Sequence, residues 1–405
     1  MLEILKPTAL IAFLAAAPLF GTTAQEAPCS YDEPANCNEE ECCFTYCYGP
    51  EETAINSPVN PRTCKGDLTL TFNPFYWKAT QDGMEFAIKN RVLGADTDPA
   101  NLELNNLIQA QYITPHYGWD FGFQLGAGYN SNCDGWDVGI LWTRYSQCSN
   151  VHEEAEIEDN QSLLPLWSGF QFPLAGDAPI IFATDAKGDW NLDLDLIHID
   201  LGRAAWVSRY VIMRPRIGVS LCQIKEEFDI EYRGGSFNNA GAGSLFTDLI
   251  ELTSKYRGIG ILTGLDTTWN LSCGFSLFGN VAASILYGRF HLDHIEWFRE
   301  TTSPFNKIRF IDTEQRLRVA RAATDLLLGV QWSALFCECR YGFTIGISWE
   351  QHLFFNQNQF WQIKRVGGET DSSMPPFNDS GQNVFEQRRG DLSTSGVTLR
   401  AKFEF

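Results

Sequence analysis

Cysteine is the residue type whose number and spacing in this chain most clearly point to chemistry. The 405-residue sequence holds 12 Cys, and a cluster of them lies near the N-terminus: Cys29, Cys37, Cys42, Cys43, Cys47 and Cys64. In an exported protein such thiols usually oxidise, within one molecule or between molecules. Adjacent Cys42 and Cys43 cannot easily share one bond, so each needs its own partner. The spacing Cys43-x₃-Cys47 also resembles a metal-ligand pair, but no His accompanies it, and we expect disulfides rather than metal.

The segment His291-Leu-Asp293-His294-Ile-Glu296 is a second group of residues that could bind a metal or transfer protons. On a β-strand, however, His291 and Asp293 point to one face while His294 and Glu296 point to the other. The sequence contains no serine nucleophile elbow and no phosphate-binding loop. We therefore expect no catalytic residue, no cofactor and no metal in a chain that is not an enzyme.

Composition excludes several classes of protein. Acidic residues outnumber basic ones 50 to 30, which gives a net charge of -20 and argues against a nucleic-acid partner. An aromatic content of 13% argues against disorder. Mean hydropathy is -0.18, and after residue 20 no apolar run reaches the roughly 18 residues that a membrane helix needs. Secreted globular proteins and membrane β-barrels remain.

The N-terminus has the features of an export signal. Residues 9–20 read ALIAFLAAAPLF, an apolar core too short to span a bilayer, and small residues at Thr22 and Ala24 suit cleavage after Ala24. A buried N-terminal helix is the alternative. We predict a signal peptide over 1–24, a Cys-rich periplasmic segment over 25–65 and a β-barrel over 66–405.

From Asp67 onward, apolar and polar residues alternate with a period of two, which is typical of strands that have one apolar and one polar face. The apolar face would contact lipid, and Trp and Tyr near strand ends would form interfacial girdles. The predicted fold is an all-β, transmembrane antiparallel barrel. Its strands are read at 67–78, 83–90, 107–116, 119–130, 136–145, 189–204, 210–231, 256–270, 275–290, 317–334, 341–355 and 393–405. A soluble β-sandwich also alternates, but its strands are usually shorter.

The lengths of the connections support a membrane barrel. Short connections such as 131–135 and 271–274 alternate with long ones such as 146–188 and 356–392, as in barrels with short periplasmic turns and long external loops. The 12 strands read directly are an even number, so both termini would be periplasmic, and 14–16 strands are plausible if long loops hide more. The connection 92–106 breaks the alternation. Counting strands from the N-terminus places it on the periplasmic side, although it is long.

Several stretches resemble the Legionella-type major outer membrane protein family, which is similar to the chlamydial major outer membrane proteins. They include YWKATQDGMEFAI from Tyr76, NLDLDLIHIDLGRAAWVSRYVIMRPRIGV, RGIGILTGLDTTWNLSCGFSLFGNVAASILYG, ISWEQHLFFNQNQFW and the terminal GDLSTSGVTLRAKFEF. The resemblance covers the chain from about residue 66 to the end. It implies a porin-like barrel, often trimeric, cross-linked by disulfides in the envelope of a chlamydia-like bacterium. The terminal Phe405 resembles the signal that the barrel-assembly machinery reads.

Residues on the polar face of each strand are candidates for lining the interior, where charge would bias ion passage. The pore-lining candidates are Asp193, Asp195, Arg214, Arg216, Asp266, Glu350, Arg400 and Lys402. Ordinary solvated residues that pair with neighbours are the alternative for each. The segments LLPLWSGFQF and APIIFA in loop 146–188 could fold inward as a constriction or pack on the rim.

The predicted topology also places cysteines. Cys133, Cys273, Cys337 and Cys339 fall at short turns, on the periplasmic side with the six N-terminal ones, and these ten are the disulfide candidates. Cys148 would lie at the outer rim and Cys222 in the wall. We therefore expect an outer-membrane porin for small hydrophilic solutes or ions that also links to envelope proteins through disulfides. The alternative is a cross-linked structural or adhesive surface protein without significant channel activity. Its partners would be membrane lipid and other copies of itself, with a trimer expected.

Overall fold

A computed structural model describes residues 49, 57–59, 66–91, 107, 109–132, 134–156, 161–169, 182–238, 246–272, 274–301, 303, 305–336, 341–366 and 382–405. The chain divides into two compact units, Met1–Cys37 and Asn38–Phe405, and every described residue belongs to the second. No helix in these residues is long and apolar enough to cross a membrane. The predicted signal peptide over 1–24 lies outside the described residues, as does all of 25–65 except Gly49 and 57–59.

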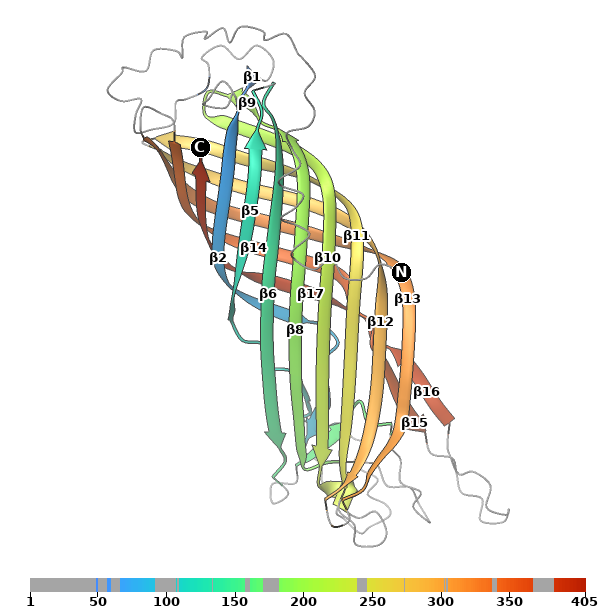
Figure 1. Ribbon diagram of the computed structural model, residues 1–405. Coiled ribbons are helices and arrows are strands. Elements are labelled where there is room, and N and C mark those ends of the chain that lie inside the picture. The colour runs from blue at the N-terminus through green and yellow to red at the C-terminus, as the bar shows by residue number, and fades with distance from the viewer. Residues whose placement is uncertain are drawn as a thin grey trace, which may run out of the picture. The chain divides into compact units, whose positions relative to one another are not determined.

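Long antiparallel strands close into a barrel (Figure 1). Its members, in chain order, are β2 (Asp67–Gln81), β5 (Asp120–Asn130), β6 (Trp136–Glu154), β8 (Asp185–Arg203), β10 (Val211–Arg233), β11 (Phe246–Ser272), β12 (Phe275–Glu300), β13 (Lys307–Phe336), β14 (Tyr341–Asn358) and β17 (Gly390–Glu404). Each pairs with the next along the chain, and β17 returns to pair with β2. The first and last strands therefore lie side by side, with backbone hydrogen bonds joining Leu68 and Phe405 in both directions.

Shorter elements are not part of the closed barrel wall. A small sheet contains β3 (Ala87–Asn90), β4 (Gln111–Ile113) and β7 (Ser162–Pro165), and a two-stranded ribbon contains β15 (Trp361–Val366) and β16 (Gln382–Gln387). Strands β1 (Ser57–Pro58) and β9 (Ala205–Ser208) pair beside β10, and a 3₁₀ turn, η3, spans Gly235–Asn238.

The prediction of 12 to 16 barrel strands is wrong, because the closed barrel has ten. The predicted strands 83–90 and 107–116 contribute only β3 and β4, which pair with each other away from the barrel wall. Residues 82–119 are therefore one long connection, and the anomaly at 92–106 disappears. Short connections (131–135, 204–210, 273–274 and 337–340) now share one end of the barrel, here called the turn end. The opposite end, here called the loop end, carries 82–119, 155–184, 234–245, 301–306 and 359–389.

An apolar belt surrounds the outer wall near the turn end. In β12 the belt runs from Phe275 to Tyr287. The side chains of Phe275, Ile285 and Tyr287 are 57%, 67% and 59% exposed. At about 3.3 Å per residue and a tilt of about 45°, this run is roughly 28 Å high, close to a hydrocarbon layer. Aromatic residues mark both edges: Tyr76, Trp119, Phe121, Trp142, Tyr287 and Trp349 toward the loop end, and Tyr129, Trp136, Trp269, Phe275, Trp332, Phe336, Tyr341, Phe403 and Phe405 toward the turn end. Such girdles are typical of membrane barrels.

The strands continue well beyond the belt toward the loop end, and there the two faces exchange character. β13 is 30 residues long, although about 9–11 residues suffice to cross a membrane. Past Tyr287 the outward residues of β12 are Arg289, His291 and Asp293, while the inward Phe290 and Leu292 are buried. The barrel is thus polar inside within the belt and apolar inside beyond it. This part beyond the belt, here called the extension, has the hydrophobic core of a water-exposed β-barrel.

Candidate functional site

A cluster of charged side chains fills part of the interior within the belt. Arg214 of β10 forms ion pairs with Asp137 of β6, Asp200 of β8 and, at 2.7 Å, Asp266 of β11. Arg216 lies 3.3 Å from Asp200 and 3.1 Å from Asp266. We call these five residues the charge cluster. Because β6 and β10 are not neighbours, the Arg214–Asp137 pair reaches across an intervening strand on the inner face.

Glycine makes room for these guanidinium groups. A Cβ atom at Gly202 would lie 2.4 Å from Nε of Arg214, and one at Gly264 would lie 3.0 Å from Nε of Arg216. The recurrence of Gly on the polar faces of the strands therefore has a concrete reason here, because the arginine side chains lie flat against the wall.

A second polar network lies opposite, on β14. The Glu350 carboxylate accepts hydrogen bonds from the Gln124 amide at 3.0 Å and from the Thr398 hydroxyl at 2.9 Å, and it lies 3.2 Å from Nε2 of His352. The other ring nitrogen of His352 is 2.6 Å from Asp325. Gln124 on β5 is separated from β14 by two strands, so this network also bridges the interior.

The structure places six of the eight predicted pore-lining residues on the inner face. They are Arg214, Arg216, Asp266, Glu350, Arg400 and Lys402, and that they line a pore stays a prediction. The predicted inward orientation of Asp193 and Asp195 is wrong. Both lie on the outer face, where they pair with Arg144, because the alternate residues of β8 are buried in the core of the extension.

Two further members of the charge cluster, Asp137 and Asp200, were not among the predicted site residues. The signal for Asp200 is a change of phase within β8. Even positions face inward along the whole strand, but apolar residues occupy them only up to Leu196 and occupy odd positions from Ile197 onward. The inner face therefore becomes polar where Asp200 lies.

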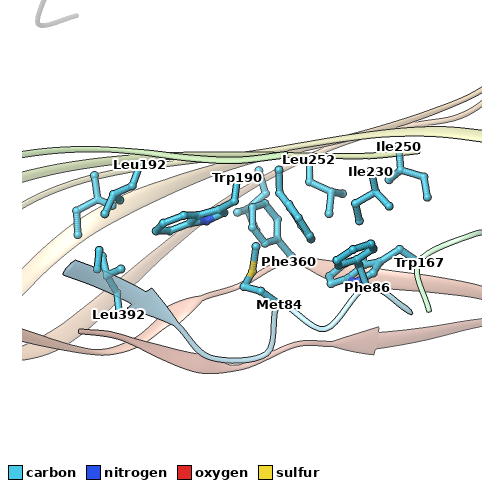
Figure 2. Packing of buried hydrophobic residues seen from close by; sticks show 14 of the residues in the cluster. Met84, Phe86, Trp167, Trp190, Leu192, Ile230, Ile250, Leu252, Phe360 and Leu392 are labelled. Carbon is cyan, nitrogen blue, oxygen red and sulfur yellow. The ribbon is translucent and has the colours of Figure 1, made fainter. Parts of the chain in front are cut away.

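Apolar side chains from three loop-end connections enter the extension and close it. Met84 and Phe86 come from 82–119, Trp167 from 155–184 and Phe360 from 359–389, and all four are buried. We call these four residues the loop plug. Figure 2 shows them packed against inward residues of the barrel strands, namely Trp190, Leu192, Ile230, Ile250, Leu252 and Leu392.

The loop plug is held by polar contacts as well as by packing. The Trp167 indole N–H donates to the Glu85 carbonyl at 2.8 Å, and the Tyr232 hydroxyl donates to the Phe86 carbonyl. The ring centroids of Phe86 and Phe228 are 6.1 Å apart, with the rings edge to face. Of the two alternatives for loop 146–188, residues 161–169 therefore take the inward one, whereas 170–181 lie outside the described residues.

The thiols that the structure describes are both unpaired. Cys148 is exposed on the outer face of β6, and Cys222 is buried on the inner face of β10. The ten disulfide candidates, Cys29, Cys37, Cys42, Cys43, Cys47, Cys64, Cys133, Cys273, Cys337 and Cys339, lie outside the described residues.

Potential metal ligands are few in the described part of the chain. His291 and Asp293 face outward and His294 and Glu296 face inward, so the predicted division of this cluster between two faces is confirmed. Sequence reasoning missed a group on β6 and β8, where ligand atoms of His152, Glu154 and Asp185 lie within 4.8 Å of one another. His152 and Glu154 are two residues apart on β6, but Asp185 is distant in sequence and only strand pairing brings it to them. A surface group of this kind is common without an ion.

Carboxyl groups are buried in the extension, outside the belt, and two of them, Glu226 and Asp248, have raised pKa values. Burial raises the pKa of Glu226 to about 8, and burial also raises the pKa of Asp248 to about 7. The outward neighbours of Glu226 are Lys225 and Glu227, which shows that this level of the wall faces water. Both acids are therefore protonated in the folded protein over a range where they would be ionised in the unfolded chain.

The raised pKa of Glu226 predicts how the stability of the folded protein depends on pH. Because the folded-state pKa of Glu226 exceeds the ordinary value of 4.5, the folded protein should lose stability as the pH rises from 4.5 through about 8. We expect Glu226→Gln to remove part of this loss, so that the variant is more stable than the parent at pH 9 and similar at pH 5, as measured by urea unfolding in lipid vesicles. Glu227→Gln, on the exposed face, is the control, and equal pH profiles for Glu226→Gln and the parent would refute the prediction.

Comparison with known proteins adds a family. The model of a family described as Legionella pneumophila major outer membrane protein precursor matches residues 61–405. A search of curated proteins finds no match.

Solved structures also show similarity. The outer membrane protease OmpT from Escherichia coli has 9% identity, covers 88% of this chain and 99% of its own, and gives a TM-score of 0.34. The attachment invasion locus protein Ail of Yersinia pestis has 11% identity, covering 66% and 97%, with a TM-score of 0.21. The Pseudomonas putida toluene transporter TodX has 10% identity, covering 86% and 92%, with a TM-score of 0.22. At these scores the likenesses carry no argument about what this chain does.

Proposed function

Since this chain belongs to the Legionella major outer membrane protein family and forms a β-barrel of the outer membrane, we propose that it is a porin of restricted conductance for small ions and hydrophilic solutes. The observation that carries the proposal is the polar inner face within the belt, where Arg214 and Arg216 both contact Asp266. A lipid-exposed belt around a charged interior is the arrangement of membrane channels.

Two barriers restrict passage. The charge cluster narrows the interior within the belt, and the loop plug fills it in the extension. Ten strands also enclose less space than the 16–18 strands of wide aqueous porins, since barrel diameter grows with strand number. Permeation then requires the loop plug to move, whereas the charge cluster selects what passes.

Orientation and partners form part of the proposal. Short turns are periplasmic in barrels of this class, so the turn end, with Asp67 and Glu404, would face the periplasm and the loop end the exterior. We also propose that β17 is the strand read by the barrel-assembly machinery, together with Phe405 directly after it, whose ring centroid lies 5.7 Å from that of Phe403. We propose that the protein forms a homotrimer.

Planar-bilayer recording tests the channel. We expect the purified parent protein to give small or rare ohmic steps, and the double variant Phe86→Ser/Trp167→Ser to raise the conductance several-fold, because both side chains are buried in the loop plug. Phe385→Ser is the control, since Phe385 on β16 is 61% exposed and lies outside the plug. Heat-modifiable mobility in electrophoresis checks that both proteins are folded. If neither the folded parent nor the folded double variant conducts ions, the porin proposal is rejected.

One observation favours a second function. The buried core of the extension makes the loop-end half a solid body, which suits a structural or adhesive surface protein joined to the envelope through its cysteines. A non-reducing ladder of envelope proteins that collapses with reductant, together with silent bilayers, would support this alternative.

A further inference from the structure

Basic side chains gather on the outer wall at the loop-end edge of the belt. Lys255, Arg257, Arg289, His291 and Arg316 line a surface hollow of about 300 Å³. They come from three neighbouring strands, β11, β12 and β13, and strand register places Arg318 directly beside Arg289. We call these six residues the basic patch. All face outward, and all except the half-buried His291 are exposed.

The arrangement within the basic patch is repulsive. Arg257 pairs in register with Arg289, and Arg289 with Arg318, so that three arginines stand side by side across the sheet. Like charges directly opposite one another destabilise a sheet. Within the described part of the chain, the structure records no ion pair for any of the three. Asp293 and Glu314 lie toward the loop end, within 3.5 Å of His291, and Glu314 also pairs with Arg316 at 2.6 Å.

The position of the basic patch relative to the belt indicates its ligand. The next outward row toward the turn end is Ile259, Tyr287 and Ala320, which begins the apolar belt. A lipid whose acyl chains lie against Ile259 and Tyr287 would therefore bring its headgroup to Arg257 and Arg289. Arginine forks bind phosphate with paired charge-assisted hydrogen bonds, and a bound phosphate would offset the repulsion among the arginines.

The outer wall at β6, three strands from β11, differs. Register runs from Arg257 through Gln223 and Asp195 to Arg144 on β6. There Arg144 pairs with Asp195 and lies 3.5 Å from Asp193, so its charge is already neutralised. Among the arginines of the outer wall at this level, the unpaired ones therefore lie on β11–β13.

We propose that the basic patch binds the phosphate groups of a phosphorylated glycolipid in the leaflet on the loop-end side of the membrane. The lipid would be held by two sets of contacts, acyl chains on the belt and phosphate on the arginines. This site is on the outer wall, so it is separate from the interior that the porin proposal concerns, and its test does not depend on conductance.

The experiment uses full-length protein in phosphatidylcholine nanodiscs, titrated with diphosphorylated lipid A, with its dephosphorylated counterpart or with inorganic phosphate. We expect the parent to bind the diphosphorylated lipid in preference to the dephosphorylated one. Arg257→Gln/Arg289→Gln should bind it at least about tenfold more weakly, since two charge-assisted contacts are lost. Arg144→Gln should bind as the parent does, and higher salt should weaken binding.

Three outcomes would overturn the proposal. The first is equal affinity of the parent and the double arginine variant, and the second is equal affinity for the two forms of the lipid. The third is that inorganic phosphate binds the basic patch as strongly as the lipid does, which would make the patch a site for free anions. Because the arginines are exposed, the variants should fold, which heat-modifiable mobility in electrophoresis checks.

Discussion

Replacing Arg214 by methionine should destabilise the barrel by about 3–5 kcal/mol, because a buried ion pair loses one partner and leaves the others uncompensated. The substitution keeps an unbranched apolar stem but removes the guanidinium group, which leaves Asp137, Asp200 and Asp266 facing one another, with Arg216 as the remaining base of the charge cluster. Urea titration of the protein refolded into lipid vesicles, followed by tryptophan fluorescence and by heat-modifiable mobility, measures the change.

Two further variants make this expectation specific. Adding Asp137→Asn and Asp200→Asn to Arg214→Met should restore much of the lost stability, since the uncompensated charges are then removed. Arg203→Met is the matched control, because Arg203 and its partner Asp134 form an exposed pair at a turn and should contribute little. A parental midpoint for Arg214→Met, or no recovery in the triple variant, would contradict the role given to the charge cluster.

The second large effect is expected in the core of the extension. Trp190 is completely buried, and its ring meets that of Tyr117 edge to face with centroids 5.1 Å apart. Trp190→Ala should therefore cost about 3–5 kcal/mol, the range for removing a large aromatic side chain from a core. Urea titration of the protein refolded into lipid vesicles measures this loss of stability.

Trp190→Phe separates packing from hydrogen bonding. The Trp190 indole nitrogen has no hydrogen-bond partner among the described residues, so phenylalanine loses packing volume but no hydrogen bond. We expect this variant to lose much less stability than Trp190→Ala. If Trp190 instead faced lipid, as its place in the alternation first suggested, Trp190→Ala would change the midpoint little, and the assignment of the inner face of β8 would be wrong.

Local alternation was enough to predict the belt. Rows such as Phe121, Phe123 and Leu125 are apolar because they face lipid, and the structure exposes them on the outer wall. The inward orientation of Arg400 and Lys402 follows from the same rule applied to β17.

The same rule failed for β8, for a physical reason. An apolar residue on alternate positions faces lipid within the belt but faces the core in the extension, and period alone does not distinguish the two environments. Trp190 through Leu196 belong to the extension, which reverses the assignment of Asp193 and Asp195. The phase change between Leu196 and Ile197 was the available signal.

The strand count failed because local patterns do not reveal which strands pair. Residues 83–90 and 107–116 do contain strands, but the strands pair with each other and with β7 rather than with the barrel wall. The parity violation at 92–106 was the sign that they did not belong to the barrel. The sequence offered inward folding of the segment with Trp167 as one of two alternatives, but the loop plug as a whole could not be predicted, since Phe86, Trp167 and Phe360 come from three separate connections and meet only in the folded protein.

The exchange of faces along each strand has a consequence for variation on the cell surface. With the loop end outside, the paired strands of the extension would stand beyond the membrane, within reach of antibodies and phages. On the extension, sequence variation should be tolerated at every second, outward residue, such as Asn191 and Asp193, while the intervening Leu192 is constrained by its buried neighbours. Substitutions that allow escape from antibodies against the outer wall would then fall at alternate residues of each strand.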